Sequence, residues 1–431
     1  MEKDHKATLL RKLRQINETL AVAEARPKPA AAPRRVPFDF ATHEKFSEIS
    51  LARQAGAFLG VESPFFRNAR AADGTRILIG DTWVENFAAY DYLGLNTCDA
   101  VRAAAAAAAR EWGVSATASR LVGGERSLHS RLEEKLAAFL GTDAALTFVS
   151  GHATNVAVLR TLLGPRDLVL VDALAHNSIF EGIRASGAAH LTFPHNDWQW
   201  VDDQLETRRH SYDNVLIAIE GLYSMDGDAP DLAKFVEVKF RHEAWLLLDE
   251  AHSLGVLGDT GRGIAEEQGI DRSAIDVTMG TLSKTFASCG GLVAGSTALT
   301  DLLRYHAPGF VYSVGLSLPN TAAALAAVET LAREPERVGR LRELSRHFRR
   351  KATDLGLDCG LSDGFAIAPI IIGDSLKATK MSNALLEKGF NVLPVIAPAV
   401  PEKSARLRIF LTQDHGRGVI DQLLDAVAEL S

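Results

Sequence analysis

Apolar runs of strand length alternate with helix-length stretches through the middle of the chain. The runs are nearly continuous in apolar residues, which is typical of strands buried on both faces of a parallel sheet. We expect seven such strands, at residues 144–149, 168–171, 190–193, 215–220, 245–249, 277–280 and 292–294. Strands that alternate with helices predict an α/β fold with a large, mostly parallel seven-stranded sheet.

The pattern changes on both sides of this region. Residues 77–79 and 82–87 alternate like two strands of a hairpin around Gly80 and Asp81, and residues 100–112 form an alanine-rich helical stretch. We therefore expect a lead-in over residues 36–95, followed by a large domain over residues 96–318.

Beyond Pro319 we expect a smaller α+β domain over residues 319–431. Residues 320–355 are helical in pattern and charged on one face. The remaining expected elements are strands at 366–372 and 406–411, and helices at 376–388 and 419–430.

The first 35 residues differ from the rest because basic residues outnumber acidic ones. Four apolar residues follow a short heptad spacing, namely Leu9, Leu13, Ile16 and Leu20. Proline and alanine then dominate residues 27–33, which is typical of an extended linker. The segment is either a helix packed on the main body or a docking helix, similar to those of polyketide synthase assembly lines.

Composition narrows the class of protein. The chain has 431 residues, 47% of them hydrophobic and 23% charged, as in ordinary globular proteins. A formal net charge of −7 argues against a general nucleic-acid binder. Cys98, Cys289 and Cys359 are widely spaced and form no metal or disulfide pattern, which fits a reducing cytoplasm. We expect no membrane span, since no apolar run is long enough.

Lys284 is the first candidate for chemistry. It follows the strand expected at 277–280, after Thr281 and Ser283, and its neighbours are small or apolar. A desolvated lysine loses its proton readily and becomes a nucleophile that can condense with an aldehyde. The two hydroxyls are well placed for a phosphate. The simpler alternative is a surface lysine at the start of a helix.

Asp249 is the second candidate, with His252 close behind it. Asp249 ends an apolar strand, where a carboxylate is costly unless it meets a cation. A protonated pyridine nitrogen is such a cation, and its carboxylate partner keeps pyridoxal phosphate an electron sink. Glu220 and Ser150 also follow expected strands, so they should share this edge of the sheet, where such folds bind ligands. The residues together predict a pyridoxal phosphate enzyme.

Several motifs occur in one order along the chain. They are Asp-Tyr-Leu-Gly-Leu at 91–95, Ser-Arg-Leu-Val-Gly-Gly at 119–124, His129, Ser-Gly-His-Ala-Thr-Asn at 150–155, His-Asn-Ser at 176–178, Glu-Gly-Leu-Tyr-Ser-Met-Asp-Gly-Asp at 220–228, Asp-Glu-Ala-His at 249–252 and Thr-Leu-Ser-Lys at 281–284. With these motifs, residues 45–430 resemble the α-oxoamine synthases. The resemblance implies a homodimeric fold-type I pyridoxal phosphate enzyme with shared active sites. It also implies decarboxylative condensation of glycine, alanine or serine with an acyl thioester, giving an α-amino ketone.

The resemblance also assigns catalytic roles. Lys284 would hold the cofactor covalently and remove the α-proton of the amino acid. Asp249 would pair with the pyridine nitrogen, and His176 would stack on the ring. His252 and Ser224 would reach the phenolic oxygen of the cofactor.

Further cofactor contacts follow from the same resemblance. Gly151 and His152 would offer backbone N–H groups to the phosphate at the start of a helix. Thr281 and Ser283 would add hydroxyls, and Glu220 would lie beside the cofactor.

Arg408 matches the arginine that holds the carboxylate of the amino acid, a task that suits a guanidinium. The alternative is an arginine in a surface ion pair. The chain departs from the usual motifs over residues 113–115 and 396–397, and at three single positions. Tyr90 replaces an asparagine, His152 replaces an aromatic residue, and Val314 replaces a threonine that would reach the partner subunit's phosphate site.

The thioester carrier is less defined than the cofactor chemistry. The basic first 35 residues favour an acyl carrier protein over coenzyme A as the partner. Two other functions stay open, an aminotransferase of the same fold and a non-catalytic partner subunit. The presence of Lys284 argues against the second of these.

Overall fold

The computed structural model describes residues 39–431, which fall into two compact units, residues 39–63 and 64–431. The expected helix and linker over residues 1–35 lie outside the described residues. The first unit contains the short helix η1 (Phe40–Thr42) and the helix α2 (Glu44–Leu59), none of whose residues is buried. We did not expect α2 from the sequence.

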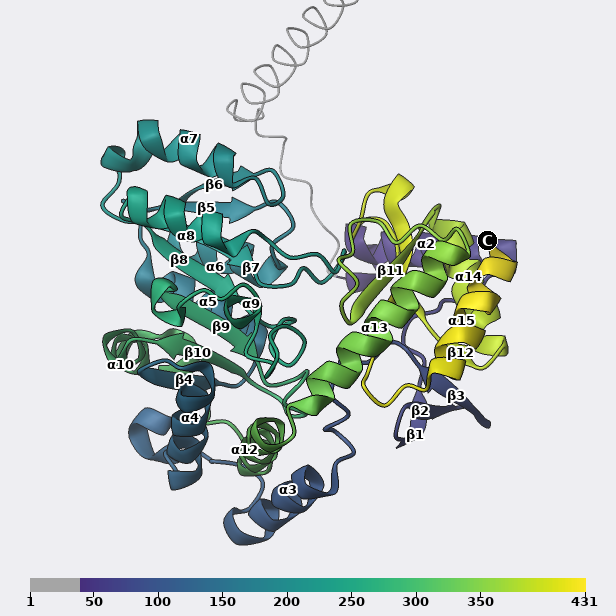
Figure 1. Cartoon of the computed structure of the whole chain (residues 1–431), viewed down its shortest axis with the longest axis horizontal. Helices are drawn as coiled ribbons and strands as arrows, with labels where there is room; N and C mark the ends of the chain where they lie inside the picture. Colours follow the sequence, from purple (N-terminus) through teal and green to yellow (C-terminus); the bar gives the residue numbers. More distant parts are fainter. Residues whose placement is uncertain (1–38) are drawn as a thin grey trace, which may run out of the picture. The chain divides into compact units, whose positions relative to one another are not determined.

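The largest sheet that the structure describes in the second unit has seven strands (Figure 1). Its strands are β4 (Ala144–Phe148), β5 (Leu168–Asp172), β6 (Ala189–Phe193), β7 (Val215–Glu220), β8 (Trp245–Asp249), β9 (Val277–Thr281) and β10 (Gly291–Gly295). They lie in the order β4-β10-β9-β8-β7-β5-β6. Only β10 runs antiparallel to its neighbours, so the prediction of a mostly parallel seven-stranded sheet is confirmed.

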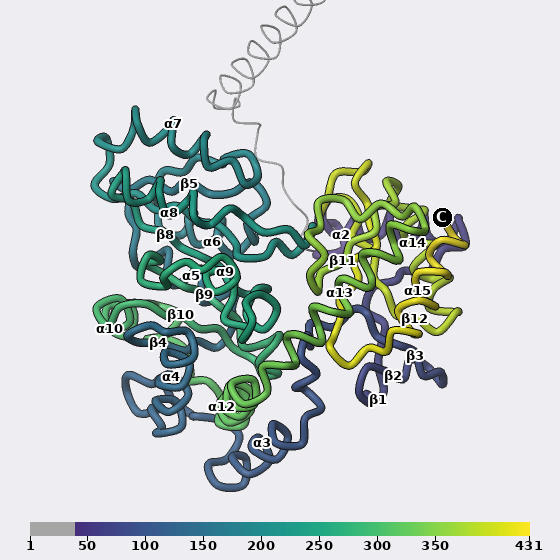
Figure 2. The backbone as a smooth tube through the Cα atoms, in the orientation of Figure 1, coloured from purple at the N-terminus to yellow at the C-terminus, as the bar shows by residue number. Residues whose placement is uncertain are grey.

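The sheet is apolar on both faces because each face carries its own core. Successive residues of β5 point to opposite faces, so Leu170 packs into the core that contains Phe235, while Val171 packs into the core that contains Ile179. The helices around the sheet can be followed in Figure 2. They are α3 (Asp99–Trp112), α4 (Ser127–Leu140), α5 (Gly151–Leu162), α6 (Asn177–Ser186), α7 (Trp198–Arg208), α8 (Leu232–Arg241), α9 (Ile264–Glu267), α10 (Thr297–His306), α11 (Pro308–Val311) and α12 (Leu318–Arg333).

The last part of the chain forms a second, three-stranded antiparallel sheet with helices. The strands are β11 (Ile367–Gly373), β14 (Ala405–Phe410) and β13 (Leu393–Val395), and the helices are α13 (Glu336–Asp354), α14 (Ser375–Glu387) and α15 (Arg417–Leu430). The single helical stretch expected over 320–355 is two helices, because Pro335 cannot continue a helix and separates α12 from α13.

The expected hairpin near the start of the chain is confirmed, and a late strand completes its sheet. The sheet contains β1 (Ala69–Asp73), β2 (Arg76–Ile79), β3 (Thr82–Asn86) and β12 (Phe390–Asn391). β12 runs parallel to β3, with Phe390 paired to Glu85. Residues 69–86 are therefore bound to the last part of the chain, while the domain borders given above stay predictions.

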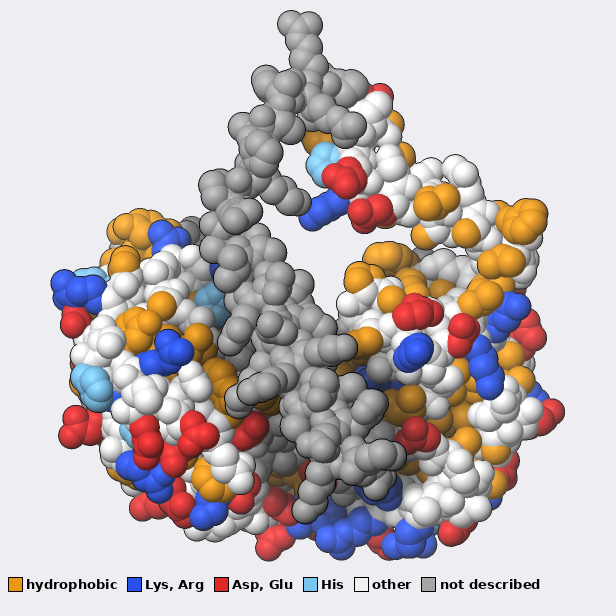
Figure 3. All heavy atoms as spheres, turned by 90° about the horizontal axis from the view of Figure 1, so that it is seen from above, with side chains coloured by type: hydrophobic (Ala, Val, Ile, Leu, Met, Phe, Trp, Pro, Cys, Tyr) orange, Lys and Arg blue, Asp and Glu red, His pale blue; other side chains and the backbone are white. Residues whose placement is uncertain are grey.

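The surface carries charges of both signs. Figure 3 shows acidic and basic side chains interspersed over the face in view. Among residues 39–431, no helix has the length and apolar character needed to cross a membrane.

Candidate functional site

The expected site residues meet at the carboxyl edge of the large sheet. Glu220 ends β7 and Asp249 ends β8, and the two are partners in the parallel ladder. Thr281 ends β9, and Lys284 follows it. Neighbouring parallel strands end at one edge of a sheet. The prediction that these side chains share this edge is therefore confirmed.

Lys284 lies half-buried at this edge. Burial lowers the pKa of its ammonium group to about 8, although the charges of Asp249 and Glu220 act in the opposite direction. Its Nζ lies 5.7 Å from the centroid of the Tyr90 ring. An amine with this pKa is partly unprotonated near neutral pH, so it can act as a nucleophile or a base.

Asp249 is held by a hydrogen-bonded chain of buried side chains. Its carboxylate accepts from Asn155 Nδ2 at 2.8 Å and from Ala251 N at 3.0 Å. Asn155 Nδ2 also donates to Ser178 Oγ at 2.9 Å, and Ser178 Oγ lies 2.7 Å from His176 Nδ1. The chain of contacts therefore links the acid to the imidazole expected to face the cofactor ring.

Asn155 and Ser178 were not among the expected site residues. A signal was present, because Asn155 lies four residues after Gly151 on α5 and so shares its helix face. Its Oδ1 is buried without a hydrogen-bond partner among the described residues. The amide therefore has an acceptor left for a bound group.

Pyridoxal phosphate fits the residues present. Asp249 is only 3% exposed and has no cationic partner among residues 39–431, which is the position a protonated pyridine nitrogen would fill. The phosphate would meet the first turn of α5, whose leading N–H groups lack intrahelical acceptors. Gly151 lies so close to Thr281 that an added Cβ would be 3.0 Å from Oγ1. Thr281 Oγ1 in turn lies 2.8 Å from Ser283 Oγ.

His252 is buried beside two tyrosines. Burial and the charge of Lys284 hold its pKa well below the usual value, so the ring is neutral. Its Nδ1 lies 2.7 Å from the hydroxyl of Tyr92, which fixes the plane of the ring. The Tyr90 ring packs edge-on against His252 at 5.9 Å. Neither tyrosine was named as a site residue, although Tyr92 belongs to a motif that the sequence singled out and Tyr90 directly precedes it.

His176 and Glu220 form another part of the site. The His176 backbone N–H donates to Glu220 Oε1 at 2.6 Å. Burial lowers the pKa of the His176 imidazole, and burial next to Asp249 raises the pKa of Glu220 well above its usual value. His152 lies edge-on to His176 with ring centroids 6.3 Å apart.

Two neighbouring arginines on β14 have different surroundings. Arg406 pairs with Asp226 at 2.5 Å, so its charge is neutralised within the fold. Arg408 contacts the Ser224 carbonyl at 3.3 Å and the Tyr90 hydroxyl at 3.5 Å. No carboxylate pairs with Arg408 among the described residues, which leaves the guanidinium available for a substrate carboxylate.

Ser224 contacts Arg408 through its backbone carbonyl. Its carbonyl accepts from Arg408, and its side-chain hydroxyl has no hydrogen bond to the described part of the protein. The expected role of this hydroxyl toward the cofactor therefore stays a prediction.

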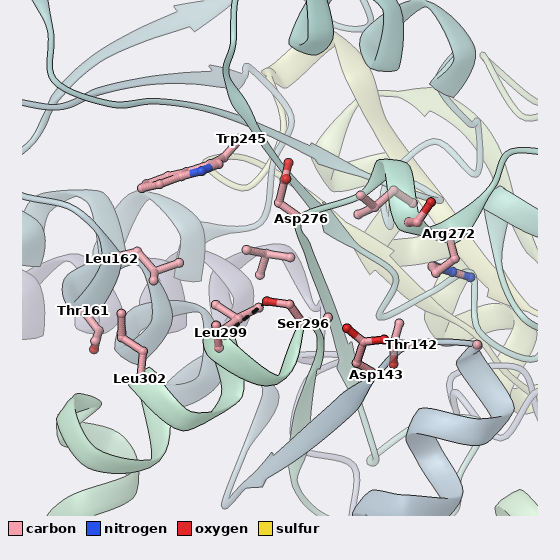
Figure 4. A pocket seen from close by; sticks show the side chains of 16 residues that line it. Thr142, Asp143, Thr161, Leu162, Trp245, Arg272, Asp276, Ser296, Leu299 and Leu302 are labelled. Carbon is pink, nitrogen blue, oxygen red and sulfur yellow. Dashed lines mark hydrogen bonds between the residues drawn. The ribbon is translucent and has the colours of Figure 1, made fainter.

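A separate cavity of about 480 Å³ lies at the opposite edge of the sheet (Figure 4). Trp245, Leu162 and Leu299 line one part of it, and Asp143 and Asp276 line another. Trp245 begins β8, whereas Asp249 ends it, so this cavity is distinct from the candidate site.

The family model and the most similar relatives point to one group of enzymes. The family model for aminotransferase class I and II matches residues 82–427. A putative 8-amino-7-oxononanoate synthase of Caulobacter vibrioides is 40% identical over 358 residues, covering 83% of this chain and 89% of that protein. The 8-amino-7-oxononanoate synthase of Cellvibrio japonicus is 38% identical over 355 residues, covering 82% and 88%.

Solved structures agree with these relatives. The chain is similar to a serine palmitoyltransferase of Sphingomonas wittichii, with a TM-score of 0.87, 29% identity and coverage of 91% of this chain and 98% of that one. A lysine-to-alanine variant of a serine palmitoyltransferase from S. paucimobilis, with a bound PLP–myriocin aldimine, matches with the same TM-score and coverage and 28% identity.

Proposed function

The chain belongs to the aminotransferase class I and II family and, within it, to the α-oxoamine synthases, and we propose that it condenses a small amino acid with an acyl thioester. Carbon dioxide is lost and the product is an α-amino ketone, so the chain is a pyridoxal phosphate-dependent C-acyltransferase. The family, fold type and cofactor expected from the sequence are thus confirmed.

One observation carries the proposal at the level of residues. A lysine with a lowered pKa and an arginine without a carboxylate partner in the described part of the chain both border Tyr90. An amino acid bound through its carboxylate to Arg408 would have its α-carbon on the side of Lys284. This is the arrangement that proton removal from the α-carbon requires.

When bound, pyridoxal phosphate supplies an electron-poor ring that accepts the electron pair left on the α-carbon. Asp249, oriented by Asn155, is the residue proposed to keep the ring nitrogen protonated. Lys284 is proposed to bind the cofactor covalently and to take the α-proton. His176 is proposed to cover the ring, and His252 to donate a hydrogen bond from its neutral imidazole.

The overall reaction balances without a further reactant. A carbon–carbon bond forms between the α-carbon and the thioester carbonyl carbon, and the carbon–sulfur bond breaks to release the thiol. The former carboxyl group leaves as carbon dioxide, the proton taken by Lys284 returns to the α-carbon in its place, and the leaving thiolate takes its proton from the solvent. Arg408 holds that carboxyl group until it leaves, which explains why its charge must not be neutralised within the protein.

The test is an absorbance titration of the cofactor-bound protein with glycine, L-alanine and L-serine in turn, followed by addition of an acyl thioester. We expect one amino acid to shift the visible band, and carbon dioxide to be released in step with free thiol. An aminotransferase would instead require a keto acid and release no carbon dioxide. A protein that shows no visible band with added pyridoxal phosphate would contradict the catalytic proposal and favour a non-catalytic partner subunit.

We propose an acyl carrier protein, rather than coenzyme A, as the thioester carrier. The support is the basic composition of residues 1–35 and the proline- and alanine-rich stretch that follows the heptad. The comparison is the rate with one acyl group on a carrier protein against the rate with the same acyl group on coenzyme A. Equal rates would remove the preference.

We also propose that the chain functions as a homodimer. Two segments, joined by a hydrogen bond of 3.0 Å from Gly315 N to Ala118 O, expose large apolar side chains. Val122 is 83% exposed and Tyr312 is 86% exposed. Exposed apolar side chains that lie together are typical of protein–protein interfaces. Sedimentation of the native chain should give a dimer, and the double variant Val122→Glu, Tyr312→Glu should give a monomer. A native monomer would contradict this proposal.

A further inference from the structure

A charged cluster next to the candidate site has no part in the chemistry described so far. His195 follows β6, and its Nδ1 lies 2.9 Å from Asp172 Oδ1. Its Nε2 lies 2.8 Å from Asp228 Oδ2, and both carboxylates are buried. A histidine that meets an acceptor at each ring nitrogen must carry both hydrogens and therefore a positive charge. Burial alone would lower the pKa of His195, but its hydrogen bonds and charge interactions with the two aspartates raise the pKa to about 10.

Asp172 connects this cluster to His176. It is the last residue of β5, and its carboxylate accepts from Leu174 N at 2.8 Å. Its backbone carbonyl accepts from Ala175 N at 3.1 Å. Asp172 therefore shapes the turn that ends at His176, whose own N–H is bound by Glu220.

Asp228 connects the cluster to Arg408. The segment 223–228 is closed on itself, since Tyr223 N donates to the Asp228 carbonyl at 2.9 Å. The same segment presents the Ser224 carbonyl to Arg408 at 3.3 Å. The Tyr223 ring also packs at right angles to His195, with centroids 4.4 Å apart.

We infer that His195 is a positioning residue: as a cation between Asp172 and Asp228, it fixes the His176 turn relative to the segment that contacts Arg408. The inference rests on the proposed function, because its effect is read through the amino acid that Arg408 would hold. If the His195 imidazole only held two surface loops together, its loss would not change the binding of the amino acid.

The test uses His195→Gln, which keeps amide donors but removes the charge. We expect the Kd and KM for the amino acid to rise by about 10-fold, with the KM for the acyl thioester unchanged and kcat lowered by less than about 3-fold. The Kd comes from the absorbance titration of the cofactor-bound protein, so it does not depend on turnover. Asp228→Asn should move the same constants in the same direction and serves as the second variant if His195→Gln does not fold.

The matched control is His347→Gln. His347 Nε2 lies 2.7 Å from Asp421 Oδ1 in a more exposed histidine–carboxylate contact between α13 and α15, and neither residue belongs to the candidate site. It should leave every kinetic constant unchanged. A lower melting temperature in His195→Gln with unchanged amino-acid Kd would overturn the inference and leave a purely structural ion pair. Native protein that binds the amino acid but consumes no thioester would overturn the proposed function alone, whereas native protein that binds no amino acid would overturn both.

Discussion

At the scale of single residues, the surroundings of Lys284 determine when it can react. The cofactor aldehyde must be attacked by the unprotonated amine, and burial lowers the pKa of that amine to about 8. The rate of pyridoxal phosphate uptake by cofactor-free protein should therefore rise by about tenfold per pH unit below pH 8 and level off above it. Stopped-flow absorbance measures this rate. A rate still rising toward pH 10 would show an ordinary lysine, and Lys284→Ala should give no covalent uptake.

Arg408 and Arg406 offer a matched pair of substitutions on one strand. Arg408→Ala should raise the KM for the amino acid by about 100-fold while leaving the melting temperature nearly unchanged. Arg406→Ala should leave Asp226 buried without a partner and lower the free energy of unfolding by about 3–5 kcal/mol. Steady-state kinetics and urea unfolding of both variants provide the comparison. The reverse assignment of effects would mean that Arg406 is the substrate ligand.

The Tyr90 ring lies near Lys284 and its hydroxyl contacts Arg408, so we expect the ring to limit the space around the α-carbon of a bound amino acid. Tyr90→Ala should increase the kcat/KM for L-serine relative to that for glycine by about 10-fold or more. Competition between the two amino acids measures this ratio directly. An unchanged ratio would place the selecting residue elsewhere.

The sequence identified some of these residues and missed others for a physical reason. Lys284 and Asp249 each follow an apolar run, so their burial and their shared edge of the sheet could be predicted from a one-dimensional pattern. Asn155 is polar within an ordinary helix, and its contact with Asp249 depends on how α5 lies on the sheet. The contacts of His195 with Asp172 and Asp228 likewise depend on the order of the strands in the sheet, which cannot be deduced from the spacing of residues along the chain.

At the scale of elements, the start of α5 depends on a residue without a side chain. An alanine Cβ at position 151 would lie 3.0 Å from Thr281 Oγ1 and push the first turn of the helix away from β9. Gly151→Ala should weaken the binding of pyridoxal phosphate by about 10-fold, since the amides and the helix dipole act over short distances. Equilibrium titration of cofactor-free protein gives this affinity. Gly164→Ala, where the nearest atom is 3.9 Å from the added Cβ, should bind the cofactor normally.

Elements were predictable where their burial repeats along the chain. All seven strands of the large sheet were expected, because strands covered on both faces consist of long apolar runs. β12 has only two residues and exists because β3 lies beside it, so no local pattern indicates it. α2 was missed because its apolar residues are exposed and form no regular stripe.

At the scale of the whole molecule, hydrogen bonds connect the start of the second unit to its last part. Arg67 donates to Asn391 Oδ1 at 2.9 Å and to Ser382 Oγ at 3.1 Å. Arg67→Ala leaves several acceptors without a donor and should lower the free energy of unfolding by about 1–3 kcal/mol. Arg70→Ala removes only exposed contacts, the pair with Asp81 and a hydrogen bond to the Gly80 carbonyl, and should change the free energy of unfolding by less than about 1 kcal/mol. Equal effects of the two substitutions in urea unfolding would contradict the proposed connection.

The pairing of β3 with β12 also sets an order of events during synthesis. Asn86 leaves the ribosome early, but its partner Asn391 is 305 residues further along the chain. The hairpin of β2 and β3 therefore has one unpaired edge during most of translation. Open strand edges pair with whatever strand is near, including those of neighbouring nascent chains. A chain released before residue 390 would keep that edge permanently exposed, which makes truncated copies of this protein natural substrates for chaperones and proteases.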